Sequence, residues 1–393
     1  MQLSERVKAI KPSPTLTITA LASRLKQEGQ DIIALAAGEP DFDTPQHIKA
    51  AAIAAIDQGY TKYTPVEGIP ALRKAVAEKF RRENSLTYEP SQVLVSVGGK
   101  QSFYNLVQAL INPGDEVIIP APYWVSYLDI VLLAGGVPKV VQADLNKQFK
   151  ITAEDLEKAL SAKTRLLVLN SPSNPTGAVY TKRELEALGA VLRNWPEIMI
   201  ASDDIYEHIL LQEDEPFCNI LNVCPDLYDR TIVLNGVSKA YAMTGWRIGY
   251  AAGPKMIIDA MASIQSQSTS NPTSISQYAA LAALEGDQTC ITPMVQAFRK
   301  RHAYLLGALN SIPGFRCLPS QGAFYSFPAV SEAMAQKGIA NDVDFCSYLL
   351  KEAQVALVPG SAFGMDGYVR FSFATSLEVL QKAIERLRRL FSK

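Results

Sequence analysis

From about residue 45 onward, short apolar segments alternate with segments whose apolar residues recur every three or four positions. Seven of the short segments are candidate strands, because each is short and apolar, as buried parallel strands are. They span 93–97, 116–120, 139–143, 165–170, 198–202, 231–235 and 249–253. The alternation predicts an α/β fold, in which helices cover both faces of a mostly parallel seven-stranded sheet.

Helix start and stop signals accompany these strands. Thr44 and Pro45 predict the start of a first helix that ends before Gly59, with Thr44 capping its free N–H groups. Its expected apolar stripe consists of Ile48, Ala52, Ala55 and Ile56. A second helix is expected over 70–84, with Leu72, Val76 and Phe80 on its buried side.

The pattern changes after about residue 290. A long helix from Pro293 to about Asn310, strands near 324–328 and 368–373, and a closing helix over 376–391 predict a smaller α+β unit. We therefore expect a large domain at 45–289 and a small C-terminal domain at 290–393. The N-terminal segment, 1–44, is expected to pack with the small domain.

The composition narrows the classes of protein to which the chain can belong. With 393 residues, 48% of them hydrophobic and 20% charged, it can bury a large core. The 38 Lys plus Arg residues balance 39 Asp plus Glu residues, so a nucleic acid or an anionic membrane is not an expected partner. Small molecules are the expected partners instead.

Cysteine and histidine usage gives little basis for a disulfide framework or a metal site. The five cysteines are scattered, with no CxxC pair, and the three histidines lack the HExxH spacing. A reducing cytoplasm and no metal are therefore expected. Neither a signal peptide nor an apolar run of about 18 residues is recognisable, so we expect no membrane span.

Polar residues follow several of the expected strands, where open α/β sheets bind their ligands. Gly98, Gly99 and Lys100 come between a strand and a helix, an arrangement that suits a phosphate but also makes an ordinary tight turn. Asn174 follows another strand, in SPSNPTG. Its amide either binds a ligand or hydrogen-bonds its own turn.

Polar side chains also follow two further strands: a carboxylate and a phenol follow one, and a lysine follows the other. Asp203, Asp204 and Tyr206 follow the strand at 198–202. Two adjacent carboxylates suggest magnesium, but the further acidic residues that such a site requires are missing nearby in sequence. Lys239 follows the strand at 231–235. A partly desolvated lysine there would have the lowered pKa that a carbonyl-attacking amine needs, although a lone lysine is usually a solvated surface charge.

These residues lie within motifs that occur together in one known family. The motifs are LAAGEPDFDTP, KYTPVEGIPALR, SPSNPTG, the Asp203/Tyr206 pair, GVSKAYAMTGWRIG and YVRFSFATS. In this order they resemble the class I aminotransferases over almost the whole chain. The resemblance implies a fold type I pyridoxal phosphate enzyme, with pyridoxal 5′-phosphate as cofactor.

The resemblance also implies roles for the residues around the cofactor. Lys239 would bind the cofactor and later move a proton between the substrate and the cofactor. Asp203 would pair with the pyridine nitrogen, and Tyr206 and Asn174 with the 3′ oxygen. Trp124 would stack on the ring, where Asn174 would also touch the substrate carboxylate.

The phosphate would be held by Arg247 and the backbone of Gly98 and Gly99, beside Lys100. Tyr63 would reach the phosphate of a neighbouring subunit, which implies a homodimer with shared sites. One departure from the family pattern is Gly236, where some relatives have a phosphate-binding serine.

Substrate recognition is expected at two positively charged residues. Arg370 lies in an apparent strand and would bind the substrate α-carboxylate beside Gly38; the alternative is an ion pair with a protein carboxylate. Lys100 and Thr15 would face a distal carboxylate, as in the aspartate branch of the family. The alternative is that Lys100 is a solvated helix residue and Thr15 a helix cap.

The expected reaction is ping-pong transfer of an amino group between aspartate or glutamate and a 2-oxo acid such as 2-oxoglutarate. Prephenate is an alternative acceptor. Another reaction on the same fold, such as a β-lyase or a cyclase, would share the cofactor residues. A ligand-binding regulator would need an added DNA-binding segment, which the balanced charge does not favour.

Overall fold

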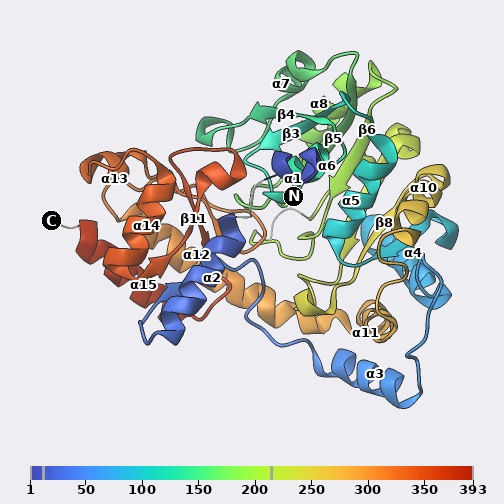
Figure 1. The fold of residues 1–393 in the computed structure, drawn as a ribbon, viewed down its shortest axis with the longest axis horizontal. Coiled ribbons are helices and arrows are strands. Elements are labelled where there is room, and N and C mark those ends of the chain that lie inside the picture. The colour runs from blue at the N-terminus through green and yellow to red at the C-terminus, as the bar shows by residue number, and fades with distance from the viewer. Residues whose placement is uncertain (1, 11–13, 213–215, 392–393) are drawn as a thin grey trace.

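The computed structural model describes residues 2–10, 14–212 and 216–391, and of residues 14–16 it describes the backbone alone. Its largest part is a seven-stranded sheet with the strand order β2-β8-β7-β6-β5-β3-β4 (Figure 1). The strands are β2 (Val93–Ser96), β3 (Glu116–Ala121), β4 (Val137–Gln142), β5 (Thr164–Asn170), β6 (Met199–Asp203), β7 (Thr231–Gly236) and β8 (Gly249–Ala252). Only β8 runs against the others. The prediction of a mostly parallel α/β sheet is confirmed.

Helices cover both faces of this sheet, because successive strand residues point to opposite sides. Leu94 packs with the helices of one face, whereas Val93 and Val95 belong to the core on the other. The first face carries α5 (Gly99–Leu110), α6 (Ser126–Leu133) and α10 (Lys255–Ser266). The second carries α4 (Pro70–Asn84), α7 (Ala153–Ala159), α8 (Lys182–Arg193), α9 (Ile220–Val223) and α11 (Ser274–Glu285), with α3 (Gln46–Asp57) packed on α11.

No helix in the described ranges has the length and apolar character needed to cross a membrane.

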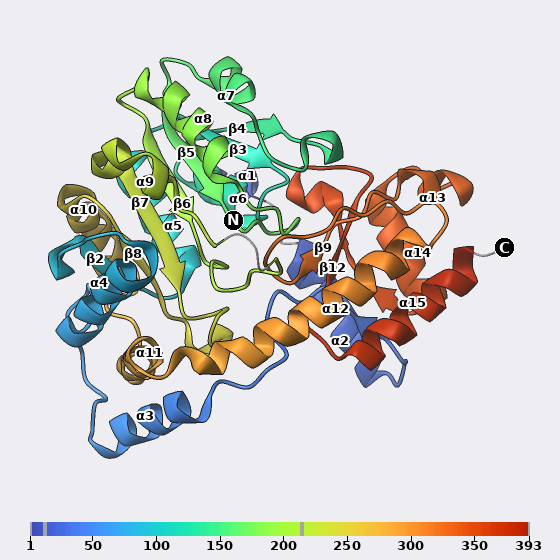
Figure 2. The same ribbon diagram turned by 180° about the vertical axis from the view of Figure 1, so that it is seen from behind.

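The C-terminal part forms a smaller unit beside the sheet, reached by the long helix α12 (Thr292–Asn310) (Figure 2). Its elements are β9 (Tyr325–Ser326), α13 (Ser331–Gln336), α14 (Asp342–Ala353), β10 (Val355–Ala356), β11 (Val358–Pro359), β12 (Val369–Ser372) and α15 (Leu377–Phe391). The order β11-β12-β9 makes an antiparallel three-stranded sheet. The expected long helix, strands and closing helix therefore all form.

The N-terminal segment touches both units. β1 (Ile33–Ala34) pairs in parallel with β10, and α2 (Pro14–Gln27) also contacts the C-terminal strands. In contrast, α1 (Glu5–Ala9) lies against α6 of the large sheet unit. The division into domains at 1–44, 45–289 and 290–393 stays a prediction.

The first expected helix, α3, ends before Gly59 as predicted but differs from the expectation at its N-terminus and in its apolar stripe. Pro45, rather than Thr44, precedes the first helical residue, and no side chain caps α3. The Thr44 hydroxyl donates to the carbonyl of Ala242 over 2.7 Å and accepts from the Trp246 indole over 2.9 Å. These long-range partners take the hydroxyl away from the helix, so the predicted cap is wrong. Ile56 is also 53% exposed instead of buried in the stripe.

Candidate active site

A cavity of about 370 Å³ opens at the carboxyl ends of β5, β6 and β7. Asn170, Asp203 and Leu234 are paired neighbours at this edge of the sheet, and the C-terminal unit supplies the opposite wall. The residues expected from sequence that line the cavity are Gly38, Gly99, Lys100, Trp124, Asn174, Asp203, Tyr206, Lys239, Arg247 and Arg370. The sheet and the C-terminal unit thus bring together residues that are up to about 330 positions apart in the chain.

Lys239 lies in the loop after β7, with its ammonium in the cavity wall. Its Nζ donates to the carbonyl oxygen of Gly38 over 2.6 Å. Burial, together with the nearby positive charge of Arg370, lowers the pKa of Lys239 from 10.5 to about 8. A substantial fraction of this amine is therefore neutral, and hence nucleophilic, slightly above neutral pH.

Asp203 ends β6 and accepts a hydrogen bond of 2.5 Å from the Tyr127 hydroxyl. Burial raises the pKa of Asp203 to about 6, against the lowering effect of that hydrogen bond. No residue in the described part of the chain forms an ion pair with it. Asp204, by contrast, is buried against Ser202 and Asn219 and does not line the cavity. Asp203 therefore has the place and the chemistry to accept a cationic partner.

The hydroxyls of Tyr206 and Tyr325 lie 2.9 Å apart in the same cavity. The guanidinium of Arg370 stands 4.5 Å from the centroid of the Tyr325 ring. Sequence reasoning selected neither Tyr325 nor Tyr127. A tyrosine within an apolar strand or helix is an ordinary core residue in sequence, and the position of its hydroxyl becomes evident only from the fold.

An anion-binding corner forms where the N-terminus of α5 meets Arg247. Gly98 precedes α5 with φ +82°, and a Cβ atom there would lie 2.4 Å from a terminal nitrogen of Arg247. A Cβ atom on Gly249 would lie 2.3 Å from the Gly99 nitrogen. Glycine at both positions therefore lets the guanidinium and the free N–H groups of the helix approach one another, which suits a phosphate.

Gly236, the departure from the family pattern, lies against the same corner. A Cβ atom there would be 3.0 Å from both the Gly249 Cα and the Ile248 carbonyl oxygen. The close approach of β7 and β8 leaves little room for a serine side chain.

Arg370 is 2% exposed and donates to the Asn174 side chain over 2.9 Å and to the Ala36 carbonyl over 2.6 Å. Its Nε is buried without a hydrogen-bond partner, and no carboxylate of the residues described pairs with this cation. The alternative of an internal ion pair therefore finds no support within those ranges. A buried unpaired guanidinium in a cavity wall suits an incoming carboxylate.

Lys100 and Trp124 line another part of the cavity, with the ammonium 5.3 Å from the centroid of the indole. Partial burial lowers the pKa of Lys100, and Arg247 acts in the same direction. Two of the expected residues that the structure describes do not line the cavity: Gly98, which immediately precedes α5, and Tyr63, which is 92% exposed on the surface. The side chain of Thr15, in α2, lies outside the described residues.

Comparison with known proteins gives the family of the chain. A model of the aminotransferase class I and II family matches residues 30–387. This chain belongs to the class I and II aminotransferases. It is 61% identical, with 100% of both chains covered, to the aspartate/prephenate aminotransferase of Nitrosomonas europaea. It is 52% identical to the aspartate aminotransferase of Geobacillus stearothermophilus, covering 99% of this chain and 98% of that one.

Solved structures agree with this assignment and with the fold type I architecture. The aminotransferase superposes on the aspartate aminotransferase from Rhizobium meliloti with a TM-score of 0.96 at 46% identity, covering 100% of this chain and 99% of that one. The enzyme from Thermus thermophilus, solved with maleate, gives a TM-score of 0.93 at 46% identity over 99% and 100% of the two chains.

Proposed function

We propose that this aminotransferase uses pyridoxal 5′-phosphate and moves an amino group between aspartate or glutamate and a 2-oxo acid such as 2-oxoglutarate, in a ping-pong reaction. One observation carries the proposal. Lys239, an amine with a lowered pKa, shares a cavity with an unpaired carboxylate, Asp203, and an unpaired buried guanidinium, Arg370. These three groups match an aldehyde, a pyridinium and a substrate carboxylate.

The residues present fit each polar part of the cofactor. Gly98, Gly99 and Arg247 would hold the phosphate, with the close approach that glycine allows. Asp203 would hold the ring nitrogen in its protonated form, which would also relieve the cost of burying this carboxylate alone. When bound, pyridoxal 5′-phosphate supplies an aldehyde for the amino group and a ring that withdraws electrons from the substrate α-carbon.

The remaining contacts of the cofactor would come from side chains around its ring. Tyr206 and Asn174 would bind the 3′ oxygen, and Trp124 would pack on the ring face. Lys100, next to Gly99, would add positive charge near the phosphate.

Lys239 and Arg370 would act on different parts of the substrate. Arg370 and Asn174 would hold the α-carboxylate, beside the Gly38 backbone, in the cavity that Lys239 Nζ also faces. The lowered pKa of Lys239 allows its Nζ to take the proton from the α-carbon and to return one at the next step. Lys100, together with Thr15, would bind the distal carboxylate of a dicarboxylic substrate.

Prephenate is a second candidate substrate, favoured by the relative at 61% identity that is named an aspartate/prephenate aminotransferase. Such an activity would place the enzyme in amino-acid biosynthesis. A β-lyase reaction would use the same cofactor residues, so it must be distinguished by the products.

We further propose a cytoplasmic homodimer with shared sites. Tyr63 is exposed in the single chain and would reach the phosphate in the partner subunit. The apolar side chains of Ile53, Ile56 and Tyr60 are also exposed nearby in sequence, as expected of a face that a second copy covers. All five cysteines are free, which fits a reducing compartment.

Half-reactions of the holoenzyme test the proposed reaction. Aspartate or glutamate alone should convert the bound aldehyde form to the amine form, seen as a change in absorbance, and 2-oxoglutarate should reverse it. Prephenate is added in the second step to test the other acceptor. Cysteine, which carries a leaving group on its β-carbon, is tested separately; release of pyruvate, ammonia and sulfide from it without the amine form would show a lyase instead. A preference for alanine or aromatic amino acids over aspartate would contradict the substrate assignment.

A further inference from the structure

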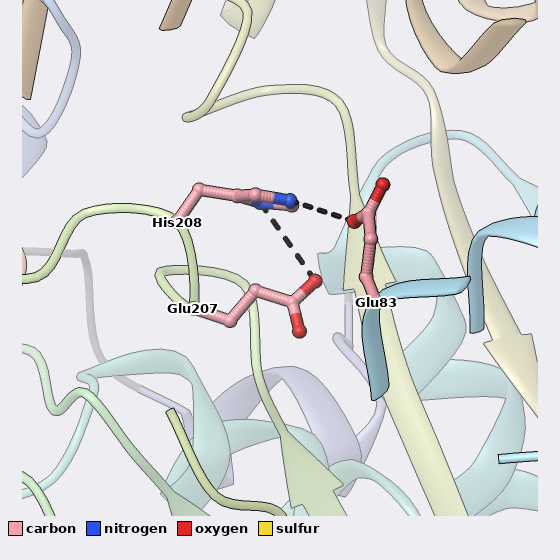
Figure 3. Close-up of side chains that lie close together, drawn as sticks. All are labelled: Glu83, Glu207 and His208. Atoms are coloured by element: carbon pink, nitrogen blue, oxygen red, sulfur yellow. Dashed lines mark hydrogen bonds and ion pairs between the residues drawn. The ribbon is translucent and has the colours of Figure 1, made fainter. Parts of the chain in front are cut away.

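Directly after Tyr206 of the cavity wall lies a partly buried cluster of charged side chains, shown in part in Figure 3. His208 Nε2 lies 2.9 Å from a Glu83 carboxylate oxygen, and His208 Nδ1 lies 3.7 Å from Glu207. These three groups could in principle hold a cation. However, the ammonium of Lys79 hydrogen-bonds to Glu207 and stands 3.6 Å from Glu83. A protein cation thus occupies the centre of the cluster, which is an ion network rather than a metal site.

The Glu207 carboxylate accepts hydrogen bonds from three side chains of this network. One of its carboxylate oxygens accepts from Lys79 and, over 2.8 Å, from the Asn235 amide. The other accepts from the Asn84 amide over 2.5 Å. Lys79 and Asn235 are at most 1% exposed, and Glu207 is 5% exposed. Hydrogen bonds among groups that are shielded from water hold their geometry strongly.

The network joins the two chain segments that carry the proposed reaction centre. Glu207 follows Tyr206 directly, and its N–H donates to the carbonyl of Asp204 over 2.9 Å, within the turn after β6. On the other side, the Asn235 side chain accepts from the N–H of Gly236 over 2.7 Å, at the end of β7. Lys239 lies three residues beyond Gly236.

The backbone ladder between β6 and β7 ends just where these side chains begin to interact. The last paired residues are Asp203 and Leu234, followed by a backbone hydrogen bond of 2.9 Å from Asp204 to Leu234. Beyond that point, the link between Glu207 and Asn235 continues the connection between the two segments.

We propose that Glu207, acting through Asn235, is a positioning residue that holds the Lys239 loop at a fixed distance from the Asp203–Tyr206 turn. This inference rests on the proposed function, in which Lys239 and Asp203 act on the same cofactor. Lys79 keeps the buried Glu207 charged and oriented, so that both hydrogen bonds of the link persist. Small displacements of a reacting group cost rate steeply, by about 100-fold for 1 Å.

The chain offers a matched pair of variants for the test. Asn235→Ala removes the amide that leads to the Lys239 loop. Asn84→Ala removes an amide at the end of α4 that donates to the same carboxylate and accepts from Lys79 over 2.8 Å, while the direct contact of Lys79 with Glu207 remains. In the holoenzyme, we expect Asn235→Ala to lower kcat about 10- to 100-fold and to change KM little. We also expect it to shift the midpoint of a pH titration that follows the absorbance of the bound cofactor. Asn84→Ala should lower thermal stability comparably while leaving kcat and the absorbance midpoint near those of the unmodified protein.

Equal effects of the two variants on kcat and on the midpoint, or no effect of Asn235→Ala, would overturn the proposal. If Asn235→Ala does not fold, Asn235→Ser withdraws the same amide and keeps a hydroxyl beside the Gly236 N–H. Glu207→Ala should reproduce the shift of the midpoint, and Glu207→Gln, which still offers an oxygen to Asn235, should restore part of the loss; no restoration would count against the link.

Borohydride reduction with peptide mapping distinguishes a failure of the positioning role from a failure of the proposed function. Label on a lysine other than Lys239 means that the proposed function has failed. Label on Lys239, combined with equal effects of the two asparagine variants, means that the positioning role alone has failed.

Discussion

Asp203 carries its charge at an energetic cost in the cofactor-free protein. Its pKa of about 6 lies above the usual value of 3.8, so the folded state binds the extra proton between these two pH values. The contribution of this proton to the free energy of unfolding is complete below about pH 4 and is lost as the pH rises through 6. We predict that Asp203→Asn makes the cofactor-free protein more stable at pH 8, by up to about 3 kcal/mol, and weakens cofactor binding. Urea unfolding and cofactor titration measure the two effects; a less stable variant at pH 8 would contradict the prediction.

A substitution of Lys100 tests whether this residue binds the distal carboxylate of the substrate. Lys100→Ala should lower kcat/KM for aspartate about 10- to 100-fold, because a charged hydrogen bond is worth about 1.5–3 kcal/mol. Alanine, which lacks the second carboxylate, serves as the control substrate and should be affected little. Steady-state kinetics with both substrates decide the matter, and equal losses would refute the role of Lys100.

How far sequence reasoning reaches is visible in individual residues of the cavity. Lys239 and Asp203 could be found because they directly follow apolar strands, and parallel strands bring their carboxyl ends to one edge. Tyr127 and Tyr325 could not, since their hydroxyls reach the site from a covering helix and from the C-terminal unit. Whether Arg370 has an internal carboxylate partner likewise depends on contacts that no local pattern encodes.

Among the elements, β8 and α5 meet so closely that only glycine fits at Gly249. We predict that Gly249→Ala pushes β8 from the N-terminus of α5, because the added Cβ atom would lie 2.3 Å from the Gly99 nitrogen. Phosphate binding should suffer most, with a loss of cofactor affinity of about 10-fold or more. Gly307→Ala in α12, where no atom lies within 4 Å of the added Cβ, is the control. Titration of both variants with cofactor gives the affinities, and unchanged affinity in Gly249→Ala would contradict the prediction.

The secondary-structure elements were more predictable than their ends. The seven strands are short apolar runs between clear helix signals, and each forms within about two residues of the expected bounds. The buried stripe of α4, Leu72, Val76 and Phe80, also follows from helical spacing. Thr44 shows the limit: its local capping signal gives way to hydrogen bonds with Ala242 and Trp246, some 200 residues away.

For the whole molecule, we predict a dimer whose two sites are each built from both subunits. Lys239→Ala and Tyr63→Phe subunits, each impaired as homodimers, should regain activity when mixed, because one site of the hybrid contains an intact Lys239 and an intact Tyr63 from the partner. If both residues served the site of their own subunit, the hybrid would contain no intact site. Activity after mixing is the measurement, with sedimentation to verify the dimer; no recovery from a damaging Tyr63→Phe variant would count against shared sites.

The identity of the lysine that carries the cofactor tests the mechanism most directly. The holoenzyme is reduced with borohydride, digested and mapped, and Lys239→Ala treated in the same way is the control. Because Lys239 has a pKa of about 8 and lines the same cavity as Asp203, we predict that the reduced cofactor is found on Lys239 and is lost in the variant. Label on any other lysine of the unmodified enzyme would contradict the proposed mechanism.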